Sequence, residues 1–232
     1  MLNILSILYR KPVAACTKCM LLLWLLLLAP ATYAHTINYA LEKAPDGNIF
    51  LYYLKLGYLH ILPNGFDHIL FITGLCLLST KLSTILWQAT AFTIAHSITL
   101  ALSVKNIIVA PPAVVEPVIA LSILCIAVEN LLVSSLSSWR IAIVFVFGLI
   151  HGMGFASALH AIGLPRNKFF LSIFSFNAGV ELGQVTVILI VFGLIIIPLR
   201  NIKNYKKIVV SPLSVLIALT ALYWTIQRIF FA

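Results

Sequence analysis

Apolar stretches of membrane-spanning length dominate this 232-residue chain and limit what it can fold into. Hydrophobic residues make up 62% of the chain and charged residues 9%, against about 25% charged in soluble domains. A helix is the form in which such a run crosses a bilayer, because it satisfies its backbone hydrogen bonds internally. The sequence therefore predicts an all-α, polytopic membrane protein with a bundle of about six transmembrane helices. The spans are 66–80, 83–104, 112–133, 140–160, 169–199 and 208–230.

The excess of positive charge does not indicate nucleic-acid binding. The net charge is +9, but the basic residues stand singly between apolar spans, apart from one cluster at 200–207. Basic residues in short loops beside a span orient a membrane protein with those loops in the cytoplasm. We therefore expect Lys81, Arg140 and the 200–207 cluster on the cytoplasmic side, with membrane lipid as a partner and no nucleic acid.

The first 34 residues have the parts of a secretory signal peptide. Basic residues precede the apolar run MLLLWLLLLAP at 20–30, and TYA at 32–34 provides a small-x-small cleavage site. Cleavage there would start the mature chain at His35, on the periplasmic side of an inner membrane. The alternative is an uncleaved first anchor, which the shortness of the apolar run disfavours.

Residues 35–65 are more polar, and we assign them to the periplasmic side and the membrane interface. The stretch ends in the aromatic-rich FLYYLKLGYLH at 50–60. Tyrosine and phenylalanine favour the headgroup level, so this composition predicts a half-buried helix leading to His60. Proline, asparagine and glycine at 63–65 then break the helix. The six-helix transmembrane domain follows at 66–232.

Ionisable side chains in or at the ends of the spans are the main functional signal. A charged group near the centre of a bilayer disfavours insertion by roughly 2.5–3.5 kcal/mol, so such residues usually serve a function. The stretch HILPNGFDHILF at 60–71 places two histidines and an aspartate at the mouth of the first span. Together with later spans it yields these candidate metal ligands: His60, Asp67, His68, His96, Glu116, His151, Asn177, Glu181 and Gln184.

Helical spacing places some of these candidates on shared faces. Asn177, Glu181 and Gln184 follow one another at intervals of four and three, which aligns them on one stripe of the fifth span. His96 lies three residues after Thr93 and so shares a face with it in the second span.

Glycines carry two further expectations. Gly148, Gly152 and Gly154 would let a neighbouring backbone approach closely around His151 in the fourth span. The fifth span is unusually long, and we expect it to be tilted, or broken near the glycines within 179–183.

Imidazole, carboxylate and amide groups that face one another inside a bundle suit a divalent cation. Neutral imidazole binds nickel, cobalt, copper, zinc or iron, and carboxylate oxygens balance the charge. The alternative is hydrogen bonding between helices, each contact worth roughly 0.6–2 kcal/mol. Such bonding explains the amides but not buried glutamate and histidine. An amide side chain could make the same hydrogen bond between helices at a lower free-energy cost of burial. Glu129 is a weaker candidate, because it faces away from Glu116 and lies near the end of its span, within reach of the surface.

We expect five of the candidates to form one connected polar cluster, with two amides as supporting or auxiliary ligands. Burying so many ionisable groups in isolation costs too much unless they satisfy one another or a cation. The five are Asp67, His68, His96, His151 and Glu181, and the two amides are Asn177 and Gln184.

Five motifs in order resemble the HupE/UreJ membrane proteins, in particular their second subgroup. They are GFDHILF, FTIAHSITLAL, EPVIALSI with a later Glu-Asn pair, FGLIHGMGFA and FNAGVELGQ, within residues 57–200. The resemblance implies a nickel or cobalt secondary permease with a cleaved leader, in a family associated with hydrogenase and urease maturation. Asp67 and His68 match the family's Gly-x-Asp-His element. His60 matches the histidine before it, although the spacing HILPNG is one residue longer here.

Two other classes of function stay open beside a permease. An intramembrane metal-dependent hydrolase would use the same histidines and carboxylates. The HExxH motif of metalloproteases and the GxSxG nucleophile elbow are both absent, however. The other class is a membrane accessory protein that transports nothing. The sequence thus predicts a non-enzymatic permease for Ni2+ or Co2+. Zn2+, Cu2+ and Fe2+ stay open as alternative metals, and homo-oligomerisation also stays open.

Overall fold

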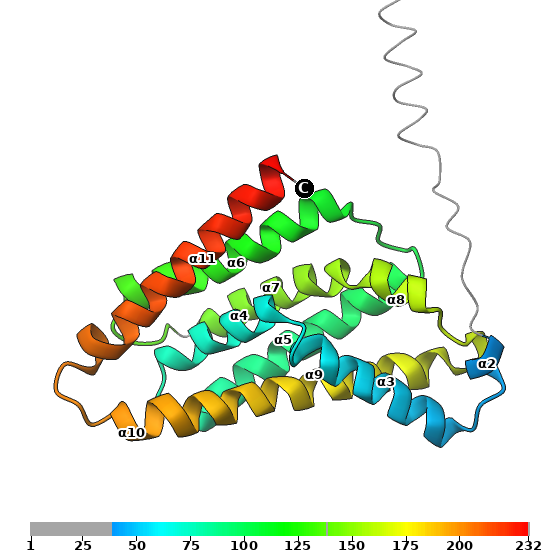
Figure 1. The fold of residues 1–232 in the computed structure, drawn as a ribbon, viewed down its shortest axis with the longest axis horizontal. Coiled ribbons are helices and arrows are strands. Elements are labelled where there is room, and N and C mark those ends of the chain that lie inside the picture. Colours follow the sequence, from blue (N-terminus) through cyan, green and yellow to red (C-terminus); the bar gives the residue numbers. More distant parts are fainter. Residues whose placement is uncertain (1–38, 138, 232) are drawn as a thin grey trace, which may run out of the picture. The chain divides into compact units, whose positions relative to one another are not determined.

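The computed structural model describes residues 39–137 and 139–231, so the predicted leader at 1–34 lies outside the described residues. Every regular element in the described residues is helical, which confirms the all-α prediction (Figure 1). Five helical segments are long and apolar enough to cross a membrane, and Phe66–Leu77 is apolar but shorter. The chain is therefore a multi-pass membrane protein by the length and composition of its helices.

The helices begin close to the predicted positions, but the fourth and fifth spans are each divided into more than one helical segment. Their bounds are α2 (Tyr39–Glu42), α3 (Asp46–Ile61), α4 (Phe66–Leu77), α5 (Leu82–Val104), α6 (Pro112–Leu132), α7 (Arg140–Gly154), α8 (Ala156–Ile162), α9 (Phe169–Val191), α10 (Ile197–Leu199) and α11 (Ser211–Phe230). A 3-10 turn, Arg166–Lys168, precedes α9. Two π-helical segments, Phe192–Ile196 and Lys206–Val210, flank the connection between α10 and α11.

The longer helices pack mainly as three pairs: α3 with α9, α5 with α7, and α6 with α11. Figure 1 shows α6 beside α11 at the top of the view and α3 along α9 at the bottom. Helix α4 contacts α5, α6, α9 and α11, and so touches all three pairs. The helix that carries Asp67 and His68 therefore lies where the pairs meet.

Helix α3 is buried along one side, where it packs closely on α9. A Cβ atom on Gly57 would lie 1.9 Å from the Phe176 carbonyl oxygen, and one on Gly179 would lie 2.0 Å from that of Leu54. Only glycine lets the two backbones approach this closely. Helix α9 runs unbroken through these contacts, so no break occurs near 179–183. The irregular turn comes later, at Phe192–Ile196.

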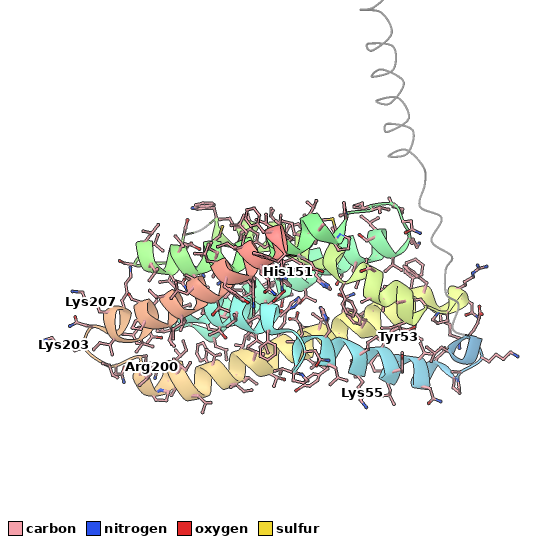
Figure 2. All side chains as sticks on the ribbon, turned by 45° about the horizontal axis from the view of Figure 1, so that its top comes forward. Tyr53, Lys55, His151, Arg200, Lys203 and Lys207 are labelled. Atoms are coloured by element: carbon pink, nitrogen blue, oxygen red, sulfur yellow. The ribbon has the colours of Figure 1, made fainter. Side chains whose placement is uncertain are left out.

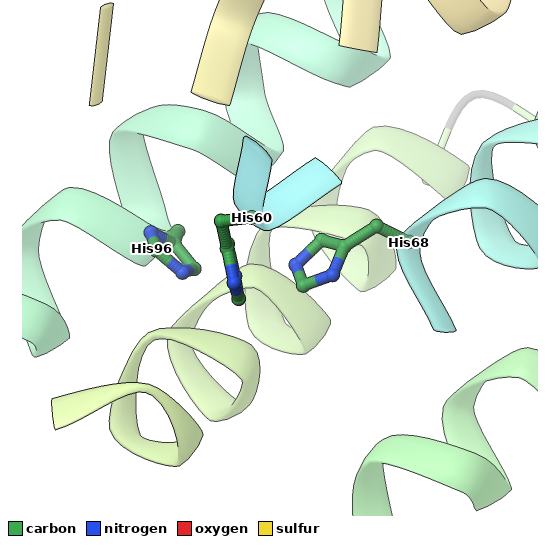
Figure 3. A group of neighbouring side chains, drawn as sticks. All are labelled: His60, His68 and His96. Carbon is green, nitrogen blue, oxygen red and sulfur yellow. The ribbon is translucent and has the colours of Figure 1, made fainter. Parts of the chain in front are cut away.

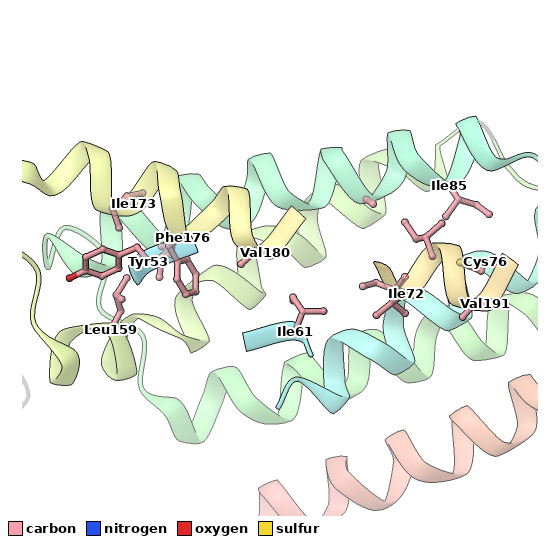
Figure 4. Packing of buried hydrophobic residues seen from close by; sticks show 14 of the residues in the cluster. Tyr53, Ile61, Ile72, Cys76, Ile85, Leu159, Ile173, Phe176, Val180 and Val191 are labelled. Atoms are coloured by element: carbon pink, nitrogen blue, oxygen red, sulfur yellow. The ribbon is translucent and has the colours of Figure 1, made fainter. Parts of the chain in front are cut away.

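Two apolar clusters hold the pairs together, and α4 contributes to both. Ile72 and Cys76 pack with residues of α3, α5 and α9 in the first cluster (Figure 4). Phe71 and Leu75 pack with residues of α5, α6, α7 and α11 in the second. Neighbouring positions of α4 thus face different helix pairs, which fixes the rotation of α4 and the direction of its polar first turn.

The basic cluster at 200–207 lies on the connection between α10 and α11. Figure 2 shows Arg200, Lys203 and Lys207 together at this connection, apart from His151. All three side chains are exposed. The cluster is thus available to act as the orienting signal that its composition predicts.

Arg140, by contrast, is 2% exposed and forms an ion pair with Glu129 at 3.1 Å. Its two terminal nitrogens also donate to Asn130 Oδ1, and Asn130 Nδ2 donates to the Gly74 carbonyl oxygen at 2.8 Å. This network, called the Arg140 network below, joins α4, α6 and α7. The Glu129 side chain is 21% exposed and so lies within reach of the surface, and its carboxylate balances the buried Arg140 cation.

Candidate metal centre

Three histidines from three helices converge inside the bundle and form what we call the histidine centre. His60 belongs to the last turn of α3, His68 to the first turn of α4, and His96 to the middle of α5. One ring nitrogen of each lies within 4.8 Å of the others. Figure 3 shows the rings pointing toward one another. Imidazoles in this arrangement suit a divalent transition metal.

The Nε2 atoms of the three histidines are buried and have no hydrogen-bond partner in the described part of the chain. Nearly all buried polar atoms in proteins are hydrogen-bonded, and leaving one unpaired costs about 1–3 kcal/mol. Hydrogen bonding between helices therefore does not explain the histidine centre. A single metal ion bound between the rings would give all three nitrogens a partner.

The break after α3 brings His60 next to His68. A Cβ atom on Gly65 would lie 2.2 Å from the His60 carbonyl oxygen, so only glycine lets the start of α4 fold back onto the end of α3. The ring centroids of His60 and His68 are 4.7 Å apart as a result. His60 thereby takes its place in the histidine centre.

Asn177 of α9 sets the proton position on His96. Its Nδ2 donates to the Ile173 carbonyl oxygen at 2.8 Å, which identifies Oδ1 as the acceptor side of the amide. The His96 Nδ1 atom lies 3.2 Å from this Oδ1 and therefore carries the proton. The lone pair on the buried and unpartnered Nε2 is then free to bind a metal. Asn177 thus acts on the ligand and not directly on a metal, as such partners commonly do.

His151 of α7 lies beside the histidine centre without joining the group of three. Its ring centroid is 5.1 Å from that of His68, and its Nε2 lies 3.0 Å from Ser122 Oγ. The Ser122 hydroxyl donates to the Ile119 carbonyl oxygen at 2.7 Å, so His151 Nε2 is the donor in their bond. His151 Nδ1 is left buried and unpartnered in the described residues. Sequence reasoning missed Ser122, which only its polarity within an apolar span could have marked.

Close packing between α5 and α7 holds His151 in place, as the glycine pattern predicts. A Cβ atom on Gly148 would lie 2.5 Å from the Phe92 carbonyl oxygen, and one on Gly152 would lie 2.3 Å from that of His96. These glycines therefore bring the two backbones together around His96 and His151. Gly154 instead faces a side chain of α6.

A cavity of about 450 Å³ leads to the histidine centre. His60, His68 and His151 line it together with Asp67, Glu116 and Arg228. His96 is fully buried and does not line the cavity. Glu116 is exposed, whereas the Asp67 side chain is 23% exposed, so acidic groups stand between the surface and the buried rings. Such an arrangement attracts cations toward the histidines.

Asp67 is held by Arg228, a residue that sequence reasoning missed. Arg228 Nη2 lies 2.9 Å and 3.2 Å from the two carboxylate oxygens of Asp67. Arg228 Nη1 also donates to the backbone oxygen of Glu116 at 3.1 Å. A basic residue in the last turn of a last helix is typical of an ordinary helix end, so nothing in the sequence singles it out.

The predicted stripe on α9 faces α5, but Glu181 does not join the histidine centre. Glu181 Oε1 accepts a hydrogen bond from Thr90 at 2.8 Å, and Gln184 Oε1 accepts one from Thr93 at 3.3 Å. Glu181 Oε2 is buried and unpartnered in the described residues. The stripe therefore forms a polar line between α5 and α9 that starts at His96 and continues toward the beginning of α5.

Comparison with known proteins agrees with the geometry. The family model described as HupE / UreJ protein matches residues 36–228, which include every candidate ligand. No match was found among curated proteins or among solved structures. The family's association with nickel or cobalt transport and with urease accessory roles fits a metal transporter. Because the match covers far more than half of the chain, the protein belongs to the HupE / UreJ family.

Proposed function

We propose that this protein is a secondary permease for a divalent transition metal, Ni2+ or Co2+, in the inner membrane of a bacterium. The observation that carries the proposal is the histidine centre, with three unpartnered nitrogens beside a cavity that His60 and His68 line. Both metals bind imidazole well. A periplasmic start of the mature chain after a cleaved leader belongs to the same proposal.

The histidine centre suits a metal that must leave again. Its three ligands are neutral imidazoles, and the group of three includes no carboxylate. Asp67, which lines the same cavity as His60 and His68, is paired with Arg228. A cation on neutral ligands alone is held less firmly than one in a charged cage. Conduction requires such a balance, with binding favourable enough to admit the ion and weak enough to release it.

The polar line between α5 and α9 provides the onward path in this proposal. Thr93 and Thr90 precede His96 by three and six residues, so the line extends about 9 Å along α5. It ends at Glu181, whose unpartnered Oε2 could receive a cation that leaves the histidines. The cavity lies at the opposite end of the histidine centre, among the first turns of α4 and α6 and the last turn of α11.

A metal-dependent hydrolase is the second candidate, and one observation favours it. Three histidines beside a cavity leave an open coordination position, as in catalytic zinc sites that activate water. The polar line beyond His96 has no role in a hydrolase, however, because substrate and product would both use the cavity. Transport accounts for both features and is therefore preferred.

Uptake by purified protein in proteoliposomes tests the proposal. We expect saturable uptake of radiolabelled Ni2+ or Co2+, lost in His68→Ala and in Glu181→Gln. His68→Ala should also lose metal binding in detergent, whereas Glu181→Gln should retain it. Tight metal binding without uptake, accompanied by hydrolysis of ester or amide substrates, would favour the enzyme instead.

A further inference from the structure

Arg228 places a fixed positive charge inside a cavity that leads to a cation-binding centre. Of the described residues that line this cavity, Arg228 is the one lysine or arginine. Its guanidinium is 21% exposed and binds both oxygens of Asp67. A cation at this point opposes the attraction that Asp67 and Glu116 would otherwise exert. A positive charge that weakens the attraction of cations needs an explanation here, because it is paired with Asp67, the residue directly before the ligand His68.

We propose that Arg228 is a selectivity residue, a resident cation that the entering metal must displace from Asp67. This inference rests on the proposed transport function. It attributes the preference of the permease for transition metals over Mg2+ and Ca2+ to the Asp67–Arg228 pair. Carboxylate oxygens alone suit these hard cations. With Arg228 in place, an ion that gains only oxygen ligands must break the Asp67–Arg228 pair without compensation. A transition metal also gains the imidazoles of His60 and His68.

The Arg228 guanidinium has other contacts that remain when it releases Asp67. Arg228 Nη1 is bonded to the Glu116 carbonyl oxygen at 3.1 Å, and its guanidinium carbon lies 5.5 Å from the centre of the Trp224 ring. Both partners belong to the α6–α11 pair. Arg228 can therefore release Asp67 of α4 and remain stabilised on its own side of the cavity. Selectivity thus arises from the difference between the binding free energy of a transition metal and that of Mg2+ or Ca2+. Breaking the Asp67–Arg228 pair costs the same for every ion, and only a transition metal recovers this cost from the histidines.

Competition between Mg2+ and Ni2+ tests this role. In Arg228→Gln, Asp67 is free, and we expect Mg2+ to weaken Ni2+ binding about fivefold more than in the unchanged protein, the value of one ion pair at this exposure. The double variant Asp67→Asn with Arg228→Gln should return to the unchanged level, because the freed carboxylate is gone. Equal sensitivity to Mg2+ in the unchanged protein and in Arg228→Gln would overturn the proposal.

Lys168→Gln is a matched control. Lys168 has a 23% exposed side chain, pairs with Asp46 at 2.7 Å and donates to the Ala44 carbonyl oxygen, but it does not line the cavity. Its loss removes the same kind of contact, and we expect no change in Mg2+ competition. An equal rise in competition for Lys168→Gln would mean that Arg228 acts only through net charge or stability, which would also overturn the proposal.

Mn2+ binding separates failure of this proposal from failure of the transport function. Mn2+ is a hard cation observed directly by electron paramagnetic resonance, so its binding needs no Ni2+ site. We expect Arg228→Gln to bind Mn2+ more tightly than the unchanged protein, and the double variant to lose this gain. If Arg228→Gln does not fold, Arg228→Met provides the same test, because methionine keeps much of the apolar length of the side chain and removes the charge that pairs with Asp67. No gain of Mn2+ binding in any folded Arg228 variant would overturn the proposal even if Ni2+ is transported.

Discussion

The histidine centre and the Arg140 network both bury ionisable groups between helices, but they differ in how far those groups are satisfied. In the Arg140 network, both terminal guanidinium nitrogens are hydrogen-bonded and Glu129 supplies the opposite charge, and only Arg140 Nε has no partner in the described residues. In the histidine centre, the Nε2 atoms of all three histidines have no hydrogen-bond partner in the described residues. Burial alone therefore does not mark a functional site in this protein.

This difference in hydrogen bonding and charge balance distinguishes buried polar groups that stabilise the fold from those that bind a ligand. A charge-balanced network joins its helices, and removing one member is costly because its partner is left buried and unpaired. An unsatisfied group lowers the stability of the folded chain until a ligand binds, so it persists where binding is needed. We therefore expect changes in the Arg140 network to affect stability, and changes in the histidine centre to affect metal binding.

Arg140→Met should give the largest effect. Removing one partner leaves Glu129 unpaired, and we expect the free energy of unfolding to fall by about 3–5 kcal/mol. Unfolding in mixed detergent micelles measures it. The double variant Arg140→Met with Glu129→Leu should recover most of the loss. Ni2+ affinity of the folded fraction should not change, and a loss of affinity there would remove the distinction between the two regions.

His68→Ala should have the converse effect. We expect Ni2+ affinity to fall by at least about 100-fold, since a ligand contributes at least as much as the partners that orient it. The free energy of unfolding should change by no more than about 1 kcal/mol, because His68 already borders the cavity and its loss removes an unpaired nitrogen. Calorimetric titration measures the affinity. Retained binding would show that the histidines are not the ligands.

Asn177→Leu should give an intermediate effect. Without the Oδ1 acceptor, the His96 ring is free to change orientation and proton position, and we expect Ni2+ affinity to fall by about 10–100-fold. Gln184→Leu is the control, since this amide lies on the same stripe but contacts Thr93 and not a histidine. Equal losses in the two variants would indicate a general effect of α9 packing.

Acidification should give the smallest effect. A histidine must be unprotonated to bind a metal, and free histidine has a pKa of about 6.5. Protons therefore compete with Ni2+ as the pH falls, but burial disfavours a charged imidazole, so we expect affinity to decrease by no more than about tenfold from about pH 7.5 to about pH 5.5. Titration at several pH values measures this change. An affinity that rises on acidification would contradict imidazole ligation.

The sequence predicts what depends on a single helix, and it fails where the result depends on which helices are neighbours. The spans, the α9 stripe and the close approach around His151 follow from periodicity and glycine spacing. Arg228 and Ser122 were missed because their roles depend on partners in other helices. Glu181 was grouped with the histidines on the basis of its helix face. The contact with Thr90, which places it further along α5, depends on the register of α9 against α5.

X-ray absorption spectroscopy of the Ni2+- or Co2+-loaded protein tests the histidine centre most directly. It reports which atoms coordinate the metal and how many of them belong to imidazole rings. We predict three imidazole nitrogens, contributed by His60, His68 and His96, and two in His96→Ala protein that still retains metal. Coordination by oxygen alone, or an imidazole signal that His96→Ala leaves unchanged, would contradict the assignment of these histidines as the metal ligands.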